Sequence, residues 1–140
     1  MGSFINIKVG SLNCRGINDS CKRRVLFDLC EKSKFTVILL QETKLDPTQH
    51  LDIEKEWKNG PILFNSVFGK KSGTIVLFNT FQMHVLNDVY DKCGRVISLD
   101  VEILGSKLHI VNFYMPNDSK EKLLFIQSSY KFIMSNLRLF

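Results

Sequence analysis

The stretch spanning residues 37–43 constrains the fold of this chain more than any other. An apolar run, Val37-Ile38-Leu39-Leu40, stops abruptly at Gln41-Glu42-Thr43. A short run of this kind is typical of a strand that is covered on both faces. In layered α/β proteins, ligands bind beyond the ends of such strands, so Gln41 and Glu42 are candidate site residues. The alternative is a solvated strand end, because most charged residues lie at the surface.

The residues around this stretch predict a β-α-β unit. Apolar and polar residues alternate over 5–9, helical spacing covers about 21–33, and a second strand covers 36–40. The length of the crossover favours parallel pairing. Asn13 has the inward parity of the first strand, and a buried amide without a partner costs roughly 1–3 kcal/mol. Asn13 is therefore a second candidate site residue.

Three cations, Lys22, Arg23 and Arg24, stand in the first turn of the predicted helix. They oppose the positive end of the helix dipole. This cluster is either a solvated face or a phosphate contact.

The middle of the chain predicts a short helix followed by hairpins. Asp46-Pro47-Thr48-Gln49 is typical of a helix start. Strands are expected over 62–68 and 74–79, joined by a turn that carries Lys70 and Lys71. Alternation over 97–103 predicts a further strand with one solvated face.

The last third predicts a strand and a helix. Residues 108–114 are apolar on both parities, which favours a central strand, and Asn112 and Tyr114 share one of its faces. Asp118 and Glu121 form a capping-box start. The apolar face expected for the helix that follows consists of Leu123, Ile126, Tyr130, Ile133 and Leu137.

Composition narrows the classes of protein. The chain has 140 residues and 44% hydrophobic residues, which suits one globular domain. It has neither an apolar run long enough for a membrane span nor a secretory leader pattern, so we expect an intracellular protein. The net charge of +5 suits a phosphate-bearing partner. The cysteines lack CxxC spacing, which makes a zinc site improbable, and His109 is expected to be a packed imidazole.

Four motifs occur in an order and spacing that resemble a known family. They are Ser11-Leu12-Asn13-Cys14-Arg15-Gly16-Ile17, Leu40-Gln41-Glu42-Thr43, Gly94-Arg95-Val96-Ile97 and Val111-Asn112-Phe113-Tyr114-Met115-Pro116-Asn117. The chain resembles the endonuclease/exonuclease/phosphatase (DNase I-like) superfamily. Within it, the likeness is greatest to the N-terminal endonuclease domain of non-LTR (LINE-type) retrotransposon polyproteins.

The resemblance implies an α/β fold that forms the N-terminal half of a four-layer α/β/β/α sandwich, with residues 1–140 as a partial domain. It implies Mg²⁺ (or Mn²⁺) as cofactor and DNA as partner. Glu42 and Asn13 would hold the metal, and Asn13, Glu42 and Tyr114 would form the catalytic site. Gln41 and Asn112 would support it, while Arg15, Lys70 and Lys71 would contact nucleic acid. In an intact element, the partners would be the other half of the domain and a reverse transcriptase. If the target is genomic DNA, the protein would act in the nucleus.

Two departures from the family pattern qualify the function. Arg15 stands where apurinic-site enzymes carry Asp, which favours the retrotransposon likeness. The family's later base and histidine segments have no match after Tyr114, so we expect the chain to be inactive alone. The alternatives are a basic fragment that only binds nucleic acid, using Arg15, Lys70, Lys71 and the 22–24 cluster, and a superfamily phosphatase acting on a phospholipid or inositol phosphate.

Overall fold

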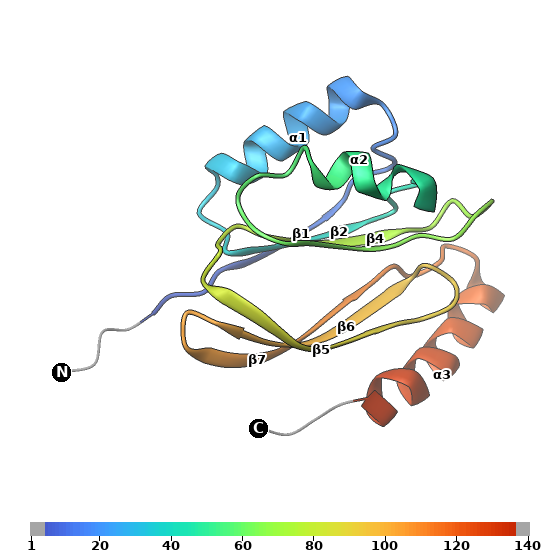
Figure 1. Ribbon diagram of the computed structural model, residues 1–140. Helices are drawn as coiled ribbons and strands as arrows, with labels where there is room; N and C mark the ends of the chain where they lie inside the picture. Colours follow the sequence, from blue (N-terminus) through green and yellow to red (C-terminus); the bar gives the residue numbers. More distant parts are fainter. Residues whose placement is uncertain (1–4, 137–140) are drawn as a thin grey trace.

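Two stacked β-sheets with helices on their outer faces make up the molecule (Figure 1). The computed structural model describes residues 5–136. One sheet has the strand order β1-β2-β4-β3 and the other has the order β5-β6-β7. Helices α1 and α2 cover the first sheet, and α3 lies on the side of the second (Figure 1). This arrangement confirms the predicted α/β class and the layering of the sandwich.

The elements follow the predicted order along the chain. The strands are β1 (Val9–Asn13), β2 (Val37–Gln41), β3 (Ile62–Asn65), β4 (Thr74–Phe78), β5 (Met83–Tyr90), β6 (Val96–Ile103) and β7 (Ser106–Phe113). The helices are α1 (Ser20–Lys32), α2 (His50–Glu54), which follows a 3-10 turn over Pro47–Gln49, and α3 (Ser119–Asn136).

The predicted β-α-β unit is confirmed. Strands β1 and β2 pair in parallel, and β2 pairs antiparallel with β4. Helix α1 begins after Asp19, whose carboxylate accepts a hydrogen bond from the Lys22 amide. Its Phe27 and Cys30 pack with Leu40 of β2 into a core between the helices and the first sheet. The residues of β2 whose side chains point to the opposite face of the sheet, including Val37, belong to a second core between the sheets.

The first strand begins later than predicted. Residues 5–8 precede β1, and Ile5 is half-exposed. Asn13 has the predicted inward parity, because it pairs with Gln41, yet it is exposed. The reason is that sheet β5-β6-β7 ends at β7, and no described strand of that sheet lies beneath β1.

Strand β7 is an edge strand, so the expectation of a central position is wrong. It is apolar on both parities because each face has its own cover. Leu108 and Ile110 contact the core between the sheets. Phe113 packs on the other side against Phe125 of α3, with 6.3 Å between ring centroids. A helix outside the sheet therefore produces the same sequence pattern as a neighbouring strand.

The expected solvated face of β6 is also wrong, because Ser98 and Asp100 are each only 1% exposed. His109 of β7 lies between them. Its Nδ1 is 2.6 Å from Asp100 Oδ1, and its Nε2 is 3.3 Å from Ser98 Oγ. The prediction of a packed imidazole at His109 is correct.

Helix α3 buries a different face from the one predicted. Its start is as expected, since Asp118 accepts hydrogen bonds from the amides of Lys120 and Glu121. However, Phe125 and Ser129 are buried, whereas Leu123, Ile126 and Tyr130 are exposed. Contact with Phe113 of β7 sets the rotation of the helix. Leu137, which was assigned to the apolar face, lies outside the described residues.

Candidate nucleic-acid and metal site

An irregular, left-handed backbone segment follows the end of β2 and positions Glu42. Glu42 and Lys44 both have left-handed backbones, with φ of 57° and 56°. Such conformations are costly for residues other than glycine and persist only where their surroundings fix them. Backbone hydrogen bonds from two neighbouring segments fix the conformations of Glu42 and Lys44. The Gly16 amide donates to Glu42 O at 2.6 Å, and the Lys44 amide donates to Ser72 O at 3.1 Å.

Polar and cationic groups surround the Glu42 carboxylate. Lys44 Nζ lies 3.2 Å from Glu42 Oε1. Desolvation raises the pKa of Glu42, but hydrogen bonds from Asn13 and Lys44 and the charges of Lys44 and Arg15 outweigh it. The net result is a pKa below the ordinary value. Glu42 is therefore a carboxylate at neutral pH, in a locally positive environment.

A cleft of about 450 Å³ opens in front of this carboxylate. The loop between β3 and β4 forms one wall and contributes Lys70 and Lys71. Ser72 holds this loop in place, because its hydroxyl donates to Cys93 O at 2.8 Å. The cleft is lined by Glu42, Lys44, Lys70, Lys71, Ser72, Cys93, Arg95, Tyr114, Pro116, Asn117, Asp118 and Glu121.

Tyr114 and Arg95 also line the cleft. The Tyr114 amide donates to Arg95 O at 2.8 Å, so the end of β7 is tied to the start of β6. Arg95 reaches towards α3, with its Nη2 3.8 Å from Glu121 Oε2 and its guanidinium 6.0 Å from the ring centre of Phe125. Arg95 and Tyr114 thus line the cleft from the second sheet.

Asn112 and Gln41 join the two sheets behind the site. Gln41 Nε2 donates to Asn112 Oδ1 and to Ser11 Oγ, each at 2.9 Å. Asn112 Nδ2 donates to Leu40 O at 3.1 Å and to Ile75 O at 2.8 Å. Asn112 is only 1% exposed. The two amides therefore fix the end of β7 against β2 and β4, directly behind the strand end that carries Glu42.

The structure brings most of the predicted site residues together. Glu42, Tyr114, Lys70 and Lys71 line the cleft, while Asn13 and Arg15 lie beside Glu42. Sequence reasoning missed Lys44, Arg95 and Asn117 as cleft residues. Arg95 and Asn117 fall within two of the quoted motifs, so the signal was present. Lys44 lies just outside its motif, and only the left-handed turn places it beside Glu42.

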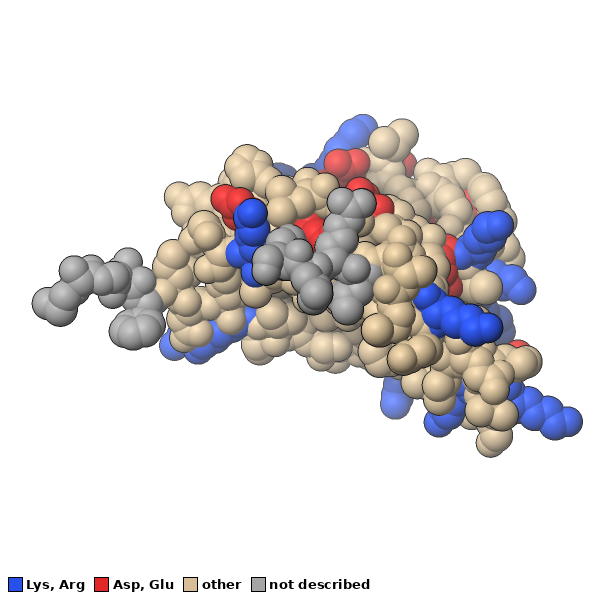
Figure 2. Space-filling model, turned by 90° about the horizontal axis from the view of Figure 1, so that it is seen from below, with Lys and Arg blue, Asp and Glu red and all other residues tan. Residues whose placement is uncertain are grey.

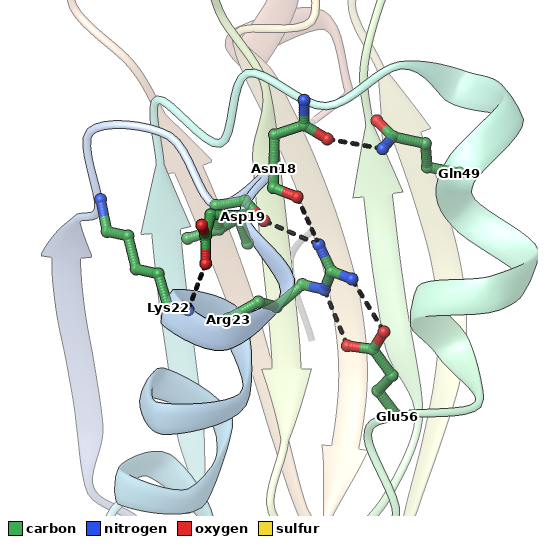
Figure 3. Close-up of polar contacts among 7 residues, drawn as sticks. Asn18, Asp19, Lys22, Arg23, Gln49 and Glu56 are labelled. Carbon is green, nitrogen blue, oxygen red and sulfur yellow. Dashed lines mark hydrogen bonds and ion pairs between the residues drawn. The ribbon is translucent and has the colours of Figure 1, made fainter.

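The 22–24 cluster does not form a basic patch. Arg23 is 7% exposed and forms a two-pronged ion pair with Glu56, with bonds of 2.7 and 2.8 Å (Figure 3). Its Nη1 donates to the carbonyls of Ile17 and Asn18. Lys22 Nζ donates to Cys14 O at 2.8 Å. Arg23 is therefore unavailable for a phosphate contact, and the network ties the loop after β1 to the segment after α2.

Charge on the face seen in Figure 2 is dispersed. On the face nearest β5-β6-β7 and α3, Lys and Arg are scattered along the rim and most of the surface is uncharged (Figure 2). None of the helices described is both long and apolar enough to cross a membrane.

The donors beside the cleft suit a hard cation. Glu42 supplies a carboxylate and Asn13 an amide oxygen, and Mg²⁺ commonly takes one or two carboxylates together with waters and substrate phosphates. Within residues 5–136, no three His, Cys, Asp or Glu side chains are grouped for metal binding. Lys44 also pairs with Glu42, so a metal would have to share that carboxylate. The residues fit a weakly held, largely hydrated Mg²⁺.

Comparison with solved structures identifies the fold. A humanised zebrafish (D. rerio) TDP2 superposes with a TM-score of 0.70 at 17% identity, over 93% of this chain and 60% of that one. An AP endonuclease from Archaeoglobus fulgidus also gives 0.70 at 15% identity, over 95% of this chain and 53% of that one. D. rerio TDP2 complexed with a single-strand DNA product gives 0.62. The chain has the DNase I-like fold.

Sequence comparison points to a transposon. The chain is 27% identical over 123 residues to the "Transposon TX1 uncharacterized 149 kDa protein" of Xenopus laevis. The match covers 87% of this chain and 9% of that protein. No family model matches the sequence. The chain thus spans about half of the structures it resembles, from 43% to 60%, and a small part of its transposon relative. The predicted resemblance to DNase I-like proteins is confirmed.

Proposed function

We propose that the cleft in front of Glu42 binds the phosphodiester backbone of DNA, as part of a retrotransposon-type, metal-dependent endonuclease domain. One observation carries the proposal. Four segments far apart in the sequence deliver Glu42, Lys44, Lys70, Lys71, Arg95 and Tyr114 to one cleft. Cations that converge on a cleft attract a phosphate backbone without regard to base sequence.

The cleft residues have distinct roles in this proposal. Lys70, Lys71 and Arg95 neutralise phosphate charge in the cleft. Tyr114 donates a hydrogen bond to a phosphate oxygen, and Asn13 orients the group bound at Glu42. Gln41 and Asn112 hold the strand ends that carry these side chains. Arg15 adds positive charge at the side of Glu42.

Glu42 and Asn13 would hold Mg²⁺, which supplies Lewis-acid stabilisation of charge on the phosphate when it is bound. Proton removal from an attacking water requires a base within hydrogen-bond reach. The lining carboxylates do not meet this need, because Glu42 pairs with Lys44, Glu121 lies near Arg95, and Asp118 caps α3. We therefore propose that residues 5–136 bind DNA without cleaving it, and that the base comes from a complementary half of the domain.

The larger context follows from the transposon relative. In an intact element, the domain would nick DNA beside a reverse transcriptase and would act in the nucleus when its target is genomic. Non-catalytic DNA binding is the second candidate function, favoured because each of the three carboxylates that line the cleft already has a partner. A phospholipid or inositol phosphate substrate remains a third candidate, since the same cleft chemistry suits any phosphodiester or phosphomonoester.

The test is DNA binding measured by fluorescence anisotropy with a short labelled duplex. We expect affinity to fall steeply as the salt concentration rises. The double variant Lys70→Ala/Lys71→Ala is expected to weaken binding by about tenfold, because each lost phosphate contact lowers the number of counterions that are released on binding. The matched control is Lys55→Ala/Lys107→Ala, which removes two lysines outside this cleft and is expected to retain affinity. Equal loss in both variants would contradict a cleft-specific site.

Cleavage and substrate class are tested separately. We expect no Mg²⁺-dependent nicking of supercoiled plasmid by the purified chain. Nicking that disappears in Glu42→Ala would show that these residues suffice for hydrolysis. Binding to phosphoinositide vesicles that exceeds binding to DNA at equal salt would favour the phosphatase alternative.

A further inference from the structure

Lys44 neutralises the carboxylate that would hold a metal. Its Nζ lies 3.2 Å from Glu42 Oε1, and the side chains of Lys44 and Glu42 are 38% and 19% exposed. The amide of Asn13 also hydrogen-bonds to this carboxylate. Two side chains of the protein itself therefore already hold Glu42, one as a counter-ion and one as a neutral donor.

Of these two partners, Lys44 is the one that can move away. Asn13 is fixed, because its Oδ1 accepts a hydrogen bond from the Arg15 amide at 3.1 Å. Lys44 instead reaches Glu42 through a flexible four-carbon stem. The stem passes Gly16, where an added Cβ would stand 3.2 Å from Lys44 Cδ. Rotation of this stem can release the carboxylate without a change in the backbone.

A divalent cation and Lys44 compete for Glu42. Both are positively charged, so the cation repels an ammonium group that shares its carboxylate. The other carboxylates of the cleft already have partners. Glu121 Oε2 lies 3.8 Å from Arg95 Nη2, and Asp118 accepts hydrogen bonds from two amides at the start of α3. Among the described residues that line the cleft, a displaced Lys44 therefore finds no free carboxylate.

The displaced ammonium group would remain among the cations of the cleft. The Lys44 amide donates to Ser72 O at 3.1 Å, so Lys44 starts at the base of the loop that carries Lys70 and Lys71. These three lysines line the same cleft. A phosphate group has the charge that they would neutralise together, and lysine is a common phosphate ligand.

We propose that Lys44 couples the two ligands of the cleft: it neutralises Glu42 until a divalent cation binds there, and it then contacts a DNA phosphate. The proposal rests on the DNA-binding function proposed above. Coupling between two ligands is reciprocal, so each raises the affinity of the other by the same factor. Lys44 therefore serves as a phosphate ligand only when Glu42 has another cation.

Mn²⁺ binding to the chain without DNA is the first test, with free Mn²⁺ measured by electron paramagnetic resonance. Lys44→Ala is expected to lower the Mn²⁺ dissociation constant by about fivefold, because a partly exposed ion pair no longer has to open. Lys44→Arg keeps the pair and should bind Mn²⁺ as the natural chain does. Lys92→Ala is the matched control, because Lys92 is exposed beside the cleft residue Cys93 but does not line the cleft.

The titration can overturn the proposal in three ways. They are an unchanged dissociation constant in Lys44→Ala, an equal gain in Lys92→Ala, and the absence of Mn²⁺ binding in every variant. Urea denaturation verifies that each variant folds. Because these samples contain no DNA, a failure here is distinct from a failure of the proposed DNA binding.

The movement of Lys44 is measured in the natural chain by ¹H–¹³C NMR of the lysine Cε groups. The Lys44 signal is assigned from its absence in Lys44→Ala. Mg²⁺ without DNA is expected to shift this signal and to leave the Lys92 signal in place. A shift of the Glu42 amide with no change at Lys44 would overturn the proposal, because the metal would then bind with the ion pair intact.

DNA binding with and without Mg²⁺ tests the coupling itself. At constant ionic strength, Mg²⁺ is expected to raise the affinity for a labelled duplex by a factor about fivefold larger in the natural chain than in Lys44→Ala. Mg²⁺ screens the DNA equally in both samples, so the difference between the two chains reports the contribution of Lys44. Equal effects of Mg²⁺ on the two chains would overturn the proposal.

Discussion

Gly73 shows how a single residue sets one wall of the cleft. Its φ is +126°, and a Cβ at this position would collide with Thr43 Oγ1. Gly73→Ala is therefore expected to destabilise the chain by about 1–3 kcal/mol, through both backbone strain and collision. Urea denaturation measures the change.

A glycine with open space around it provides the control for this substitution. Gly69 also has a positive φ of +69°, but nothing lies within 4 Å of its would-be Cβ. Gly69→Ala should cost less, since only backbone strain applies. Equal losses in the two variants would mean that the contact with Thr43 does not matter.

Asn112 is the residue whose loss should most disturb the alignment of the sheets. Asn112→Leu would leave Leu40 O and Ile75 O without the Asn112 donor and would remove one of the acceptors of Gln41. Each unsatisfied buried group costs about 1–3 kcal/mol. We expect a lower midpoint in urea and weaker DNA binding, because both strand ends shift. An unchanged midpoint would contradict the role given to this amide.

The residues of the site could be predicted only in part from the sequence. Glu42 was identifiable because an apolar run ends at a carboxylate. Lys44 was not, because its position depends on left-handed backbone turns at Glu42 and Lys44 that hydrogen bonds from distant loops hold in place. Arg23 was expected either on a solvated face or in a phosphate contact, but it is buried against Glu56, a tertiary contact that local sequence does not encode.

Among the elements, α1 and the segment after α2 are joined by the Arg23 ion pair (Figure 3). Glu56→Gln would leave the buried guanidinium without its anion. A fully buried pair broken in this way costs 3–5 kcal/mol, but Glu56 is 38% exposed, so we expect about 1–2 kcal/mol. Denaturation midpoints at neutral pH measure it, with Asp28→Asn in the exposed Lys32 pair as the near-silent control.

The same pair predicts a pH dependence. The hydrogen bond from Arg23 lowers the pKa of Glu56 below its ordinary value of 4.5. A lowered carboxyl pKa stabilises the fold above that ordinary value, and the stabilisation is lost as the pH falls through the native pKa. The stability difference between the natural chain and Glu56→Gln should therefore shrink as the solution is acidified below about 4.5. A constant difference would contradict this assignment.

Element types were predictable, but their neighbours were not. Periodicity gave the β-α-β unit, the hairpin of β3 and β4, and the start of α3. It misplaced β7, which pairs with β6 alone in the described sheet, and it chose the wrong face of α3, whose buried side carries Phe125 against Phe113. The burial of Ser98 and Asp100 likewise depends on His109 from the next strand.

At the scale of the whole molecule, the account unites a DNase I-like sandwich with one cationic cleft. The face on the side of α3 carries scattered cations (Figure 2). Lys44, Lys70, Lys71 and Arg95, by contrast, line one cleft together with Glu42. The central claim is that this cleft, and no other basic surface, is where nucleic acid binds.

The most direct test is an NMR titration of the ¹⁵N-labelled chain with a short DNA duplex at low salt. The account predicts that the largest amide shifts fall on Glu42, Lys44, Arg95, Tyr114 and the loop carrying Lys70 and Lys71, and that Glu42 itself shifts further when Mg²⁺ is added. Shifts that centre instead on Lys22 and Arg24 of α1, with the cleft unperturbed, would contradict it.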